Sequence, residues 1–186
     1  AAITAFSLAR EAVTVTLEYD CTDADKCDMA FVTGVLNSDW TAVRERGKNL
    51  RSYLSELLFD AEDLRKNETC PSDTVCSGKG FCQSVYQVWT DKPNPAYASH
   101  CANSTDQPML DWMQEQNQSK TGVVLIYTCN RLSCASAESV ANITKEILRD
   151  YFLPFNATIP PASTVAPITT TISTDTSGPT TSPGTS

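Results

Sequence analysis

The chain has 186 residues, of which 41% are hydrophobic and 19% charged, and its net charge is −8. This length suits one domain with its own core, and the acidic balance argues against nucleic acid or an anionic membrane surface as the main partner. The longest apolar run, Gly122 to Tyr127, is too short to span a bilayer.

The N-terminal part of the chain predicts a strand followed by a short apolar segment. The first residues contain no basic segment, so we expect a mature N-terminus from which a signal peptide has been removed. Apolar and polar residues alternate from Ala12 to Tyr19, which predicts a half-buried strand. An acidic loop between Cys21 and Cys27 follows, and the apolar segment runs from Met29 to Leu36.

A long amphipathic helix is predicted from Asp39 to Lys66, with Ser38 or Asp39 as its N-cap. Apolar residues recur there at spacings of three, four and seven, while basic and polar residues occupy the other face. The predicted apolar stripe contains Val43, Leu50, Leu54, Leu57, Ala61 and Leu64.

Two further helices and a buried strand are predicted in the second half of the chain. One helix is expected to start near Asp106, with Pro108 in its first turn and Leu110, Trp112 and Met113 as apolar contacts. Val123 to Tyr127 is a buried-strand candidate. Ser136 can cap a helix whose stripe contains Val140, Ile143, Ile147, Leu148 and Tyr151. These elements predict an α+β domain over residues 1–155, with amphipathic helices packed on a short sheet.

The C-terminal segment, residues 156–186, has a different composition. Half of the residues from Ala157 to Ser186 are Ser or Thr, and Asp175 carries the only charge. Such a segment buries too little apolar surface to offset its ordering entropy, so we expect it to be disordered. It is typical of an O-glycosylated stalk, or of a plain linker to another domain.

The cysteine spacing favours disulfides over metal or redox chemistry. Structural zinc sites use pairs separated by two to four residues, and only one pair here meets that spacing. No C-x-x-C pair is present for redox catalysis, and His100 is the only imidazole. We therefore expect disulfides among the eight cysteines, without a cofactor or metal; they are Cys21, Cys27, Cys70, Cys76, Cys82, Cys101, Cys129 and Cys134.

Five N-x-[ST] sequons accompany the even number of cysteines. Together these features predict a secreted or cell-surface glycoprotein. The candidate glycosylation sites are Asn67, Asn103, Asn117, Asn142 and Asn156.

The stretch from Cys70 through Cys76 to Cys82, with Ser77-Gly-Lys-Gly-Phe81 before the last cysteine, resembles the first half of an EGF-like module. The resemblance implies a disulfide-stapled extracellular loop region over residues 70–101. EGF-like modules continue with a C-x-C pair, whereas the next cysteines here lie at long spacings.

A wider resemblance, over residues 13–82, is to the C-terminal end of hyaluronidase-type glycosidases. It is carried by Leu50-Arg-Ser-Tyr-Leu-Ser-Glu-Leu-Leu58, the sequon at Asn67 and the cysteines that follow. It implies an accessory domain of a larger secreted enzyme. The D-x-E carboxylates of the catalytic strand are missing, so no catalytic residue is carried over.

Few residues suggest a reactive site. A loop histidine beside a cysteine is more often structural than catalytic. The aspartates at 20, 23, 25 and 28 lack the Gly and Glu of a calcium loop, so they indicate a solvated acidic loop. Tyr86, Trp89 and Tyr97 lie in a polar stretch, where they can anchor a ligand or pack onto a disulfide.

The sequence as a whole predicts a non-catalytic extracellular domain that recognises a protein or glycan partner. No nucleic acid is expected as partner, and no membrane insertion within this chain; a membrane anchor beyond Ser186 is compatible with a stalk. Two alternatives remain open at this point: an accessory domain of a secreted glycosidase, and a carrier of a small ligand or lipid.

If the cysteines are all paired, alkylation of the native protein should add no mass, whereas alkylation after reduction should label every cysteine. Intact-protein mass spectrometry makes this comparison. Several free thiols in the native protein would contradict both the disulfides and the secretory assignment.

Overall fold

The computed structural model describes residues 1–19, 27–62, 70–71, 76, 81–102, 108–116 and 120–154. These residues form an α+β fold, as the sequence predicts. Six strands and three helices follow in the order β1 (Ala2–Ser7), β2 (Ala12–Leu17), α1 (Cys27–Asn37), α2 (Thr41–Leu58), β3 (Cys82–Trp89), β4 (Ala96–Cys101), β5 (Met109–Gln116), β6 (Thr121–Cys129) and α3 (Ala137–Asp150). The expected disordered segment, 156–186, lies outside the described residues.

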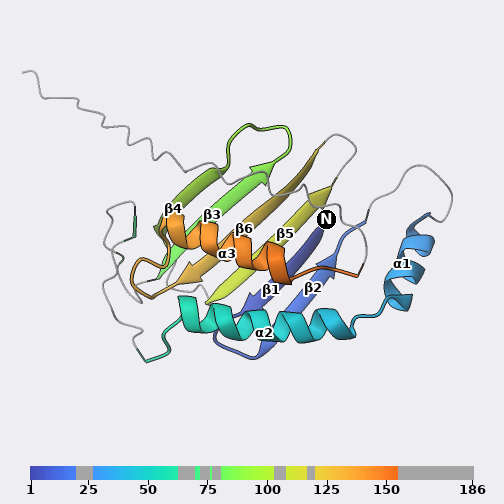
Figure 1. Ribbon diagram of the computed structural model, residues 1–186, viewed down its shortest axis with the longest axis horizontal. Coiled ribbons are helices and arrows are strands. Elements are labelled where there is room, and N and C mark those ends of the chain that lie inside the picture. The colour runs from blue at the N-terminus through green and yellow to red at the C-terminus, as the bar shows by residue number, and fades with distance from the viewer. Residues whose placement is uncertain are drawn as a thin grey trace, which may run out of the picture.

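The strands form one antiparallel sheet in the order β2-β1-β5-β6-β3-β4. Helices α2 and α3 cover the same face of this sheet, and α1 lies beyond the β2 edge (Figure 1). The central position of β5 joins the N-terminal hairpin to the C-terminal strands. None of the described helices is long and apolar enough to cross a membrane.

The core lies between the sheet and the two covering helices. Directly opposed residues in the register share a face, and Phe6, Leu110 and Tyr127 form one such buried row across three strands. Trp112 and Leu125 form part of the next row and are also fully buried. Full burial of each such side chain contributes about 1.5–3 kcal/mol of transfer free energy.

Three predicted elements are confirmed. Strand β2 matches the alternation from residue 12, and β6 contains the buried run Val123 to Tyr127. Helix α3 begins after Ser136, whose hydroxyl accepts a hydrogen bond from the Ser139 backbone N–H at 3.2 Å. Its buried stripe contains Val140, Ile143, Thr144 and Ile147 and continues into Tyr151.

The predicted helix at 39–66 is correct in type but too long. Helix α2 ends at Leu58, and its buried stripe is Val43, Gly47, Leu50, Leu54 and Leu58. Leu57, predicted to be buried, is 38% exposed, because a residue one position before Leu58 points away from the sheet. The predicted N-cap is wrong: Trp40 is the N-cap and makes no side-chain capping hydrogen bond, while Asp39, one residue earlier, accepts at Oδ1 from the Thr41 backbone N–H at 2.9 Å.

The helix predicted near Asp106 is wrong, because residues 109–116 form strand β5. Leu110, Trp112 and Gln114 alternate on the buried face, which is the period of a strand. Pairing with β1 on one side and β6 on the other overrides the local helix pattern. Strand β1 and the β3–β4 hairpin were not predicted from the sequence at all; the hairpin falls in the polar stretch between Cys82 and Cys101.

The C-terminal end of α2 is held by the segment that follows β6. The Asn130 backbone N–H donates to the Leu58 carbonyl at 3.1 Å. The Asn130 side chain accepts from the Asp60 N–H at 2.7 Å and donates to the Asp60 carbonyl at 2.8 Å. One residue therefore fixes the turn that terminates the helix.

Gly47 of α2 is buried against Tyr151 and Val13 of β2. A Cβ atom at this position would lie 3.4 Å from Tyr151 Cε2 and 3.5 Å from Val13 Cγ1, which is ordinary van der Waals contact. A methyl group therefore fits, whereas a longer side chain would push the helix away from the strand.

We expect Gly47→Ala to raise the free energy of unfolding by about 0.5–1 kcal/mol, because alanine lowers the entropy cost of the helix without a clash. Gly47→Leu should lower it by about 1–3 kcal/mol through overpacking. Urea unfolding measures both changes. Destabilisation by alanine would contradict the spacing between α2, β2 and Tyr151.

Candidate functional site

The three aromatic residues predicted as a possible interaction surface do not lie together on one face of the sheet. Tyr86 is 2% exposed and belongs to the core, which corrects the expectation that it is available to a ligand. Tyr97 is half-buried on the same face, and its hydroxyl donates to the Ala135 carbonyl. Trp89 lies three residues after Tyr86 and therefore on the opposite face of the sheet.

Trp89 packs instead on the neighbouring strand. Its ring covers Gly122, where any Cβ atom would overlap it. The Lys120 ammonium lies 4.6 Å from the ring centroid, in cation–π geometry. The ring therefore makes structural contacts at the end of the β3–β6 pair.

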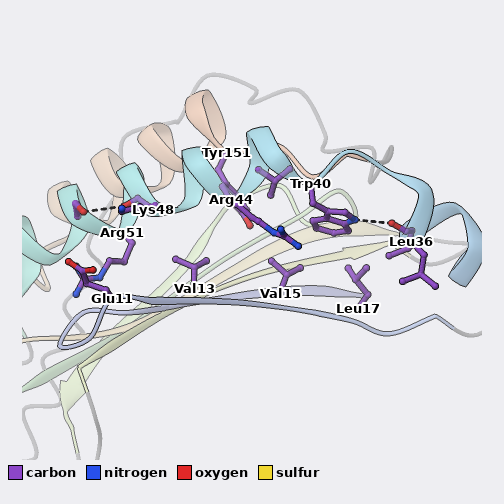
Figure 2. A pocket seen from close by; sticks show the side chains of 13 residues that line it. Glu11, Val13, Val15, Leu17, Leu36, Trp40, Arg44, Lys48, Arg51 and Tyr151 are labelled. Carbon is purple, nitrogen blue, oxygen red and sulfur yellow. Dashed lines mark hydrogen bonds between the residues drawn. The ribbon is translucent and has the colours of Figure 1, made fainter.

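A groove lies between β2 and the two helices α1 and α2 (Figure 2). Its volume is about 740 Å³, which is in the range of ligand sites. Aliphatic side chains of β2 form the floor, and helical residues form the walls. It is lined by Glu11, Val13, Val15, Leu17, Val35, Leu36, Trp40, Val43, Arg44, Lys48, Arg51, Ser52 and Tyr151.

The side chains of the floor and of the α2 wall face each other, because every second residue of β2 and every fourth residue of α2 point to the same side of their element. Val13, Val15 and Leu17 alternate along β2 and point toward α2 (Figure 2). Arg44 and Lys48 are four residues apart, so they lie on one side of α2. All three floor residues remain partly exposed, so the groove is open to solvent along its floor.

The two ends of the groove are held by hydrogen bonds. At one end the Trp40 indole Nε1 donates to the Val35 carbonyl at 2.8 Å and fixes the corner between α1 and α2. At the other end Arg51 donates from Nε to the Ser7 carbonyl at 2.9 Å and from Nη2 to the Leu8 carbonyl at 3.3 Å. The α2 wall is therefore tied to the β1–β2 hairpin, and the α1 wall is tied to the start of α2.

Two cationic side chains of the groove are available to a partner. Arg44 and Lys48 are exposed, and neither makes an ion pair with another described residue. Glu11 is the only acidic residue among the described residues that line the groove. Although the chain has a net charge of −8, Arg44 and Lys48 therefore form a local positive site above an apolar floor.

A second hollow, between α2 and the end of α3, has a volume of about 700 Å³. Two cations and two carboxylates line it, and Arg149 forms ion pairs with both Glu146 and Asp150. The charge of Arg149 is therefore balanced, whereas Arg44 and Lys48 have no acidic partner among the described residues.

The described cysteines form three disulfides, Cys70–Cys82, Cys76–Cys101 and Cys129–Cys134. The first two interleave where β3 begins and β4 ends. The sulfur atoms of Cys70, Cys76 and Cys82 lie within 4.8 Å of one another, the one grouping with metal-ligand spacing in the described part of the chain. Metal binding requires thiolates, so these sulfur atoms are unavailable as ligands while they are bonded in disulfides.

Several predicted site residues lie outside the described residues. They are Cys21, the side chain of Cys27, the acidic loop, and the sequons at Asn67, Asn103, Asn117 and Asn156. Asn142 is described and lies exposed on α3, where a glycan is sterically allowed. His100 is exposed on β4, opposite Gln83 of β3.

The second face of the sheet is not covered by any described helix. Near its centre, Met109 is 41% exposed, and Asp111, Met113 and Ile126 are partly buried. Burial raises the pKa of the Asp111 carboxyl above its ordinary value of 3.8. A carboxylate among apolar side chains is therefore a local source of instability at neutral pH.

No protein-family model, curated protein or solved structure matches the chain. The resemblances of residues 70–82 to an EGF-like module and of residues 13–82 to hyaluronidase-type glycosidases stay predictions. A role for the groove has to be inferred from the chain's own residues.

We expect Asp111→Asn to raise the melting temperature at pH 7. The folded-state pKa of Asp111 lies above the unfolded value, so the charged carboxylate costs stability above the folded pKa and costs nothing below pH 3.8. The gain should therefore shrink as the pH falls and vanish near pH 3 in calorimetry. An equal gain at both pH values would show that the carboxyl charge is not its cause.

Proposed function

We propose that residues 1–154 are a non-catalytic recognition domain of a secreted or cell-surface glycoprotein, and that the groove between β2 and α2 binds a protein partner. The single observation that carries this proposal is the combination of an apolar floor with two cations, Arg44 and Lys48, that have no acidic partner among the described residues. That combination is complementary to a segment with both apolar and acidic side chains.

The shape of the groove favours a protein partner over a small lipid. A carrier encloses most of its ligand, whereas Val13, Val15 and Leu17 remain partly exposed along the floor. At the rim Leu36 is 76% exposed, so the apolar surface continues outward from the groove. A partner that covers the rim buries this surface as well as the floor.

The proposal can be tested with a displayed library of random twelve-residue peptides, selected on the full chain. We expect the selected peptides to be acidic and apolar. Their affinity for the double variant Arg44→Glu/Lys48→Glu should fall by about tenfold or more, because the charge complementarity is reversed. Biolayer interferometry measures the affinities.

The matched control is Lys92→Glu/Lys145→Glu, which makes the same charge change at exposed positions outside the groove. This variant should bind the peptides like the native protein. Failure to select any peptide, or equal losses in the two variants, would count against recognition through the groove.

A further inference from the structure

Strand β2 ends the sheet on the side where the groove lies. It pairs with β1 on one edge, and its other edge has no strand partner among the described residues. Its six residues, AVTVTL, contain no charge, proline or glycine. Natural edge strands are usually protected by such residues or by a bulge, and β2 has neither, so its sequence does not protect this edge from another strand.

The hydrogen-bond phase of the β1–β2 hairpin identifies which backbone groups face outward. Ala1 N donates to the Glu18 carbonyl at 2.7 Å, and the Glu18 N–H donates to the Ala1 carbonyl at 2.8 Å. Such mutually bonded pairs alternate with non-bonded pairs in an antiparallel ladder. Thr14 and Thr16 therefore bond to β1.

It follows that Val13, Val15 and Leu17 direct their N–H and C=O groups to the free edge. The same three residues form the floor of the groove. The edge of β2 thus supplies backbone donors and acceptors for a new strand, and the adjoining groove supplies an apolar surface for its side chains.

We propose that an extended acidic segment of a partner protein binds as a seventh strand beside β2, with alternate side chains directed into the groove. This inference rests on the proposed function and specifies its mode of binding. Arg44 and Lys48 supply the charge complementarity, since neither has an acidic partner among the described residues. A second copy of this chain is disfavoured, because pairing β2 with β2 would place the two sets of cations on the same face.

The peptides selected on the native protein provide the probe, synthesised with a single N-methyl group at each successive residue. If the peptide binds as an added strand, only every second amide N–H of the peptide bonds to β2. N-methylation should therefore lower the affinity at every second position. Binding in a helical conformation would give no period of two.

The protein-side test compares Val15→Pro with Val15→Ala. Both truncate the side chain, but only proline removes the outward N–H, and an edge strand accepts proline where that N–H faces solvent. We expect the proline variant to bind at least about tenfold more weakly than the alanine variant, because it loses a hydrogen bond and its ring obstructs the new strand. Circular dichroism confirms that both variants are folded.

Equal binding by the two variants, or N-methyl effects without a period of two, would overturn strand addition and leave recognition through the groove intact. A dimer of the free protein that Val15→Pro dissociates, seen by light scattering, would assign the edge to a second copy instead. If the library yields no peptide, both the proposed function and its binding mode fail.

Discussion

The contact between α2, β2 and Tyr151 is the constraint on which the groove depends. Gly47 lets the helix approach the strand, and Tyr151 fills the space beneath it. The ring of Tyr151 contacts Phe6 edge to face, with centroids 5.5 Å apart, and its hydroxyl accepts from Thr4 Oγ1 at 3.2 Å. The helix is therefore positioned by the core, and the groove beside it is formed before any partner binds.

Two of the described disulfides and the proposed recognition surface lie at opposite edges of the sheet. Cys70 is bonded to Cys82 of β3 and Cys76 to Cys101 of β4, and these strands lie four and five positions from β2 in the sheet order. Such disulfides stabilise the folded state mainly by lowering the conformational entropy of the unfolded chain. This arrangement allows the surface along β2 to vary in sequence without loss of the cross-links.

The elements with one clear periodicity were predictable from the sequence, and the others were not. Helix α3 has a capping serine and a continuous apolar stripe, and β2 alternates cleanly. Residues 109–116 are compatible with either period, and only the neighbouring strands β1 and β6 decide between them. The groove could not be predicted, because its floor is local to β2 but its wall depends on the tertiary position of α2.

The central placement of β5 has a consequence for how the chain reaches its native state. Strand β1 pairs with residues 109–114 of β5, so the N-terminal hairpin has no partner on its β1 side until most of the domain has been synthesised. Pairings at such sequence separation slow folding, and during that interval the hairpin, whose two strands carry no charge, is open to association along both edges. The nascent chain should therefore require a chaperone more than the finished domain does.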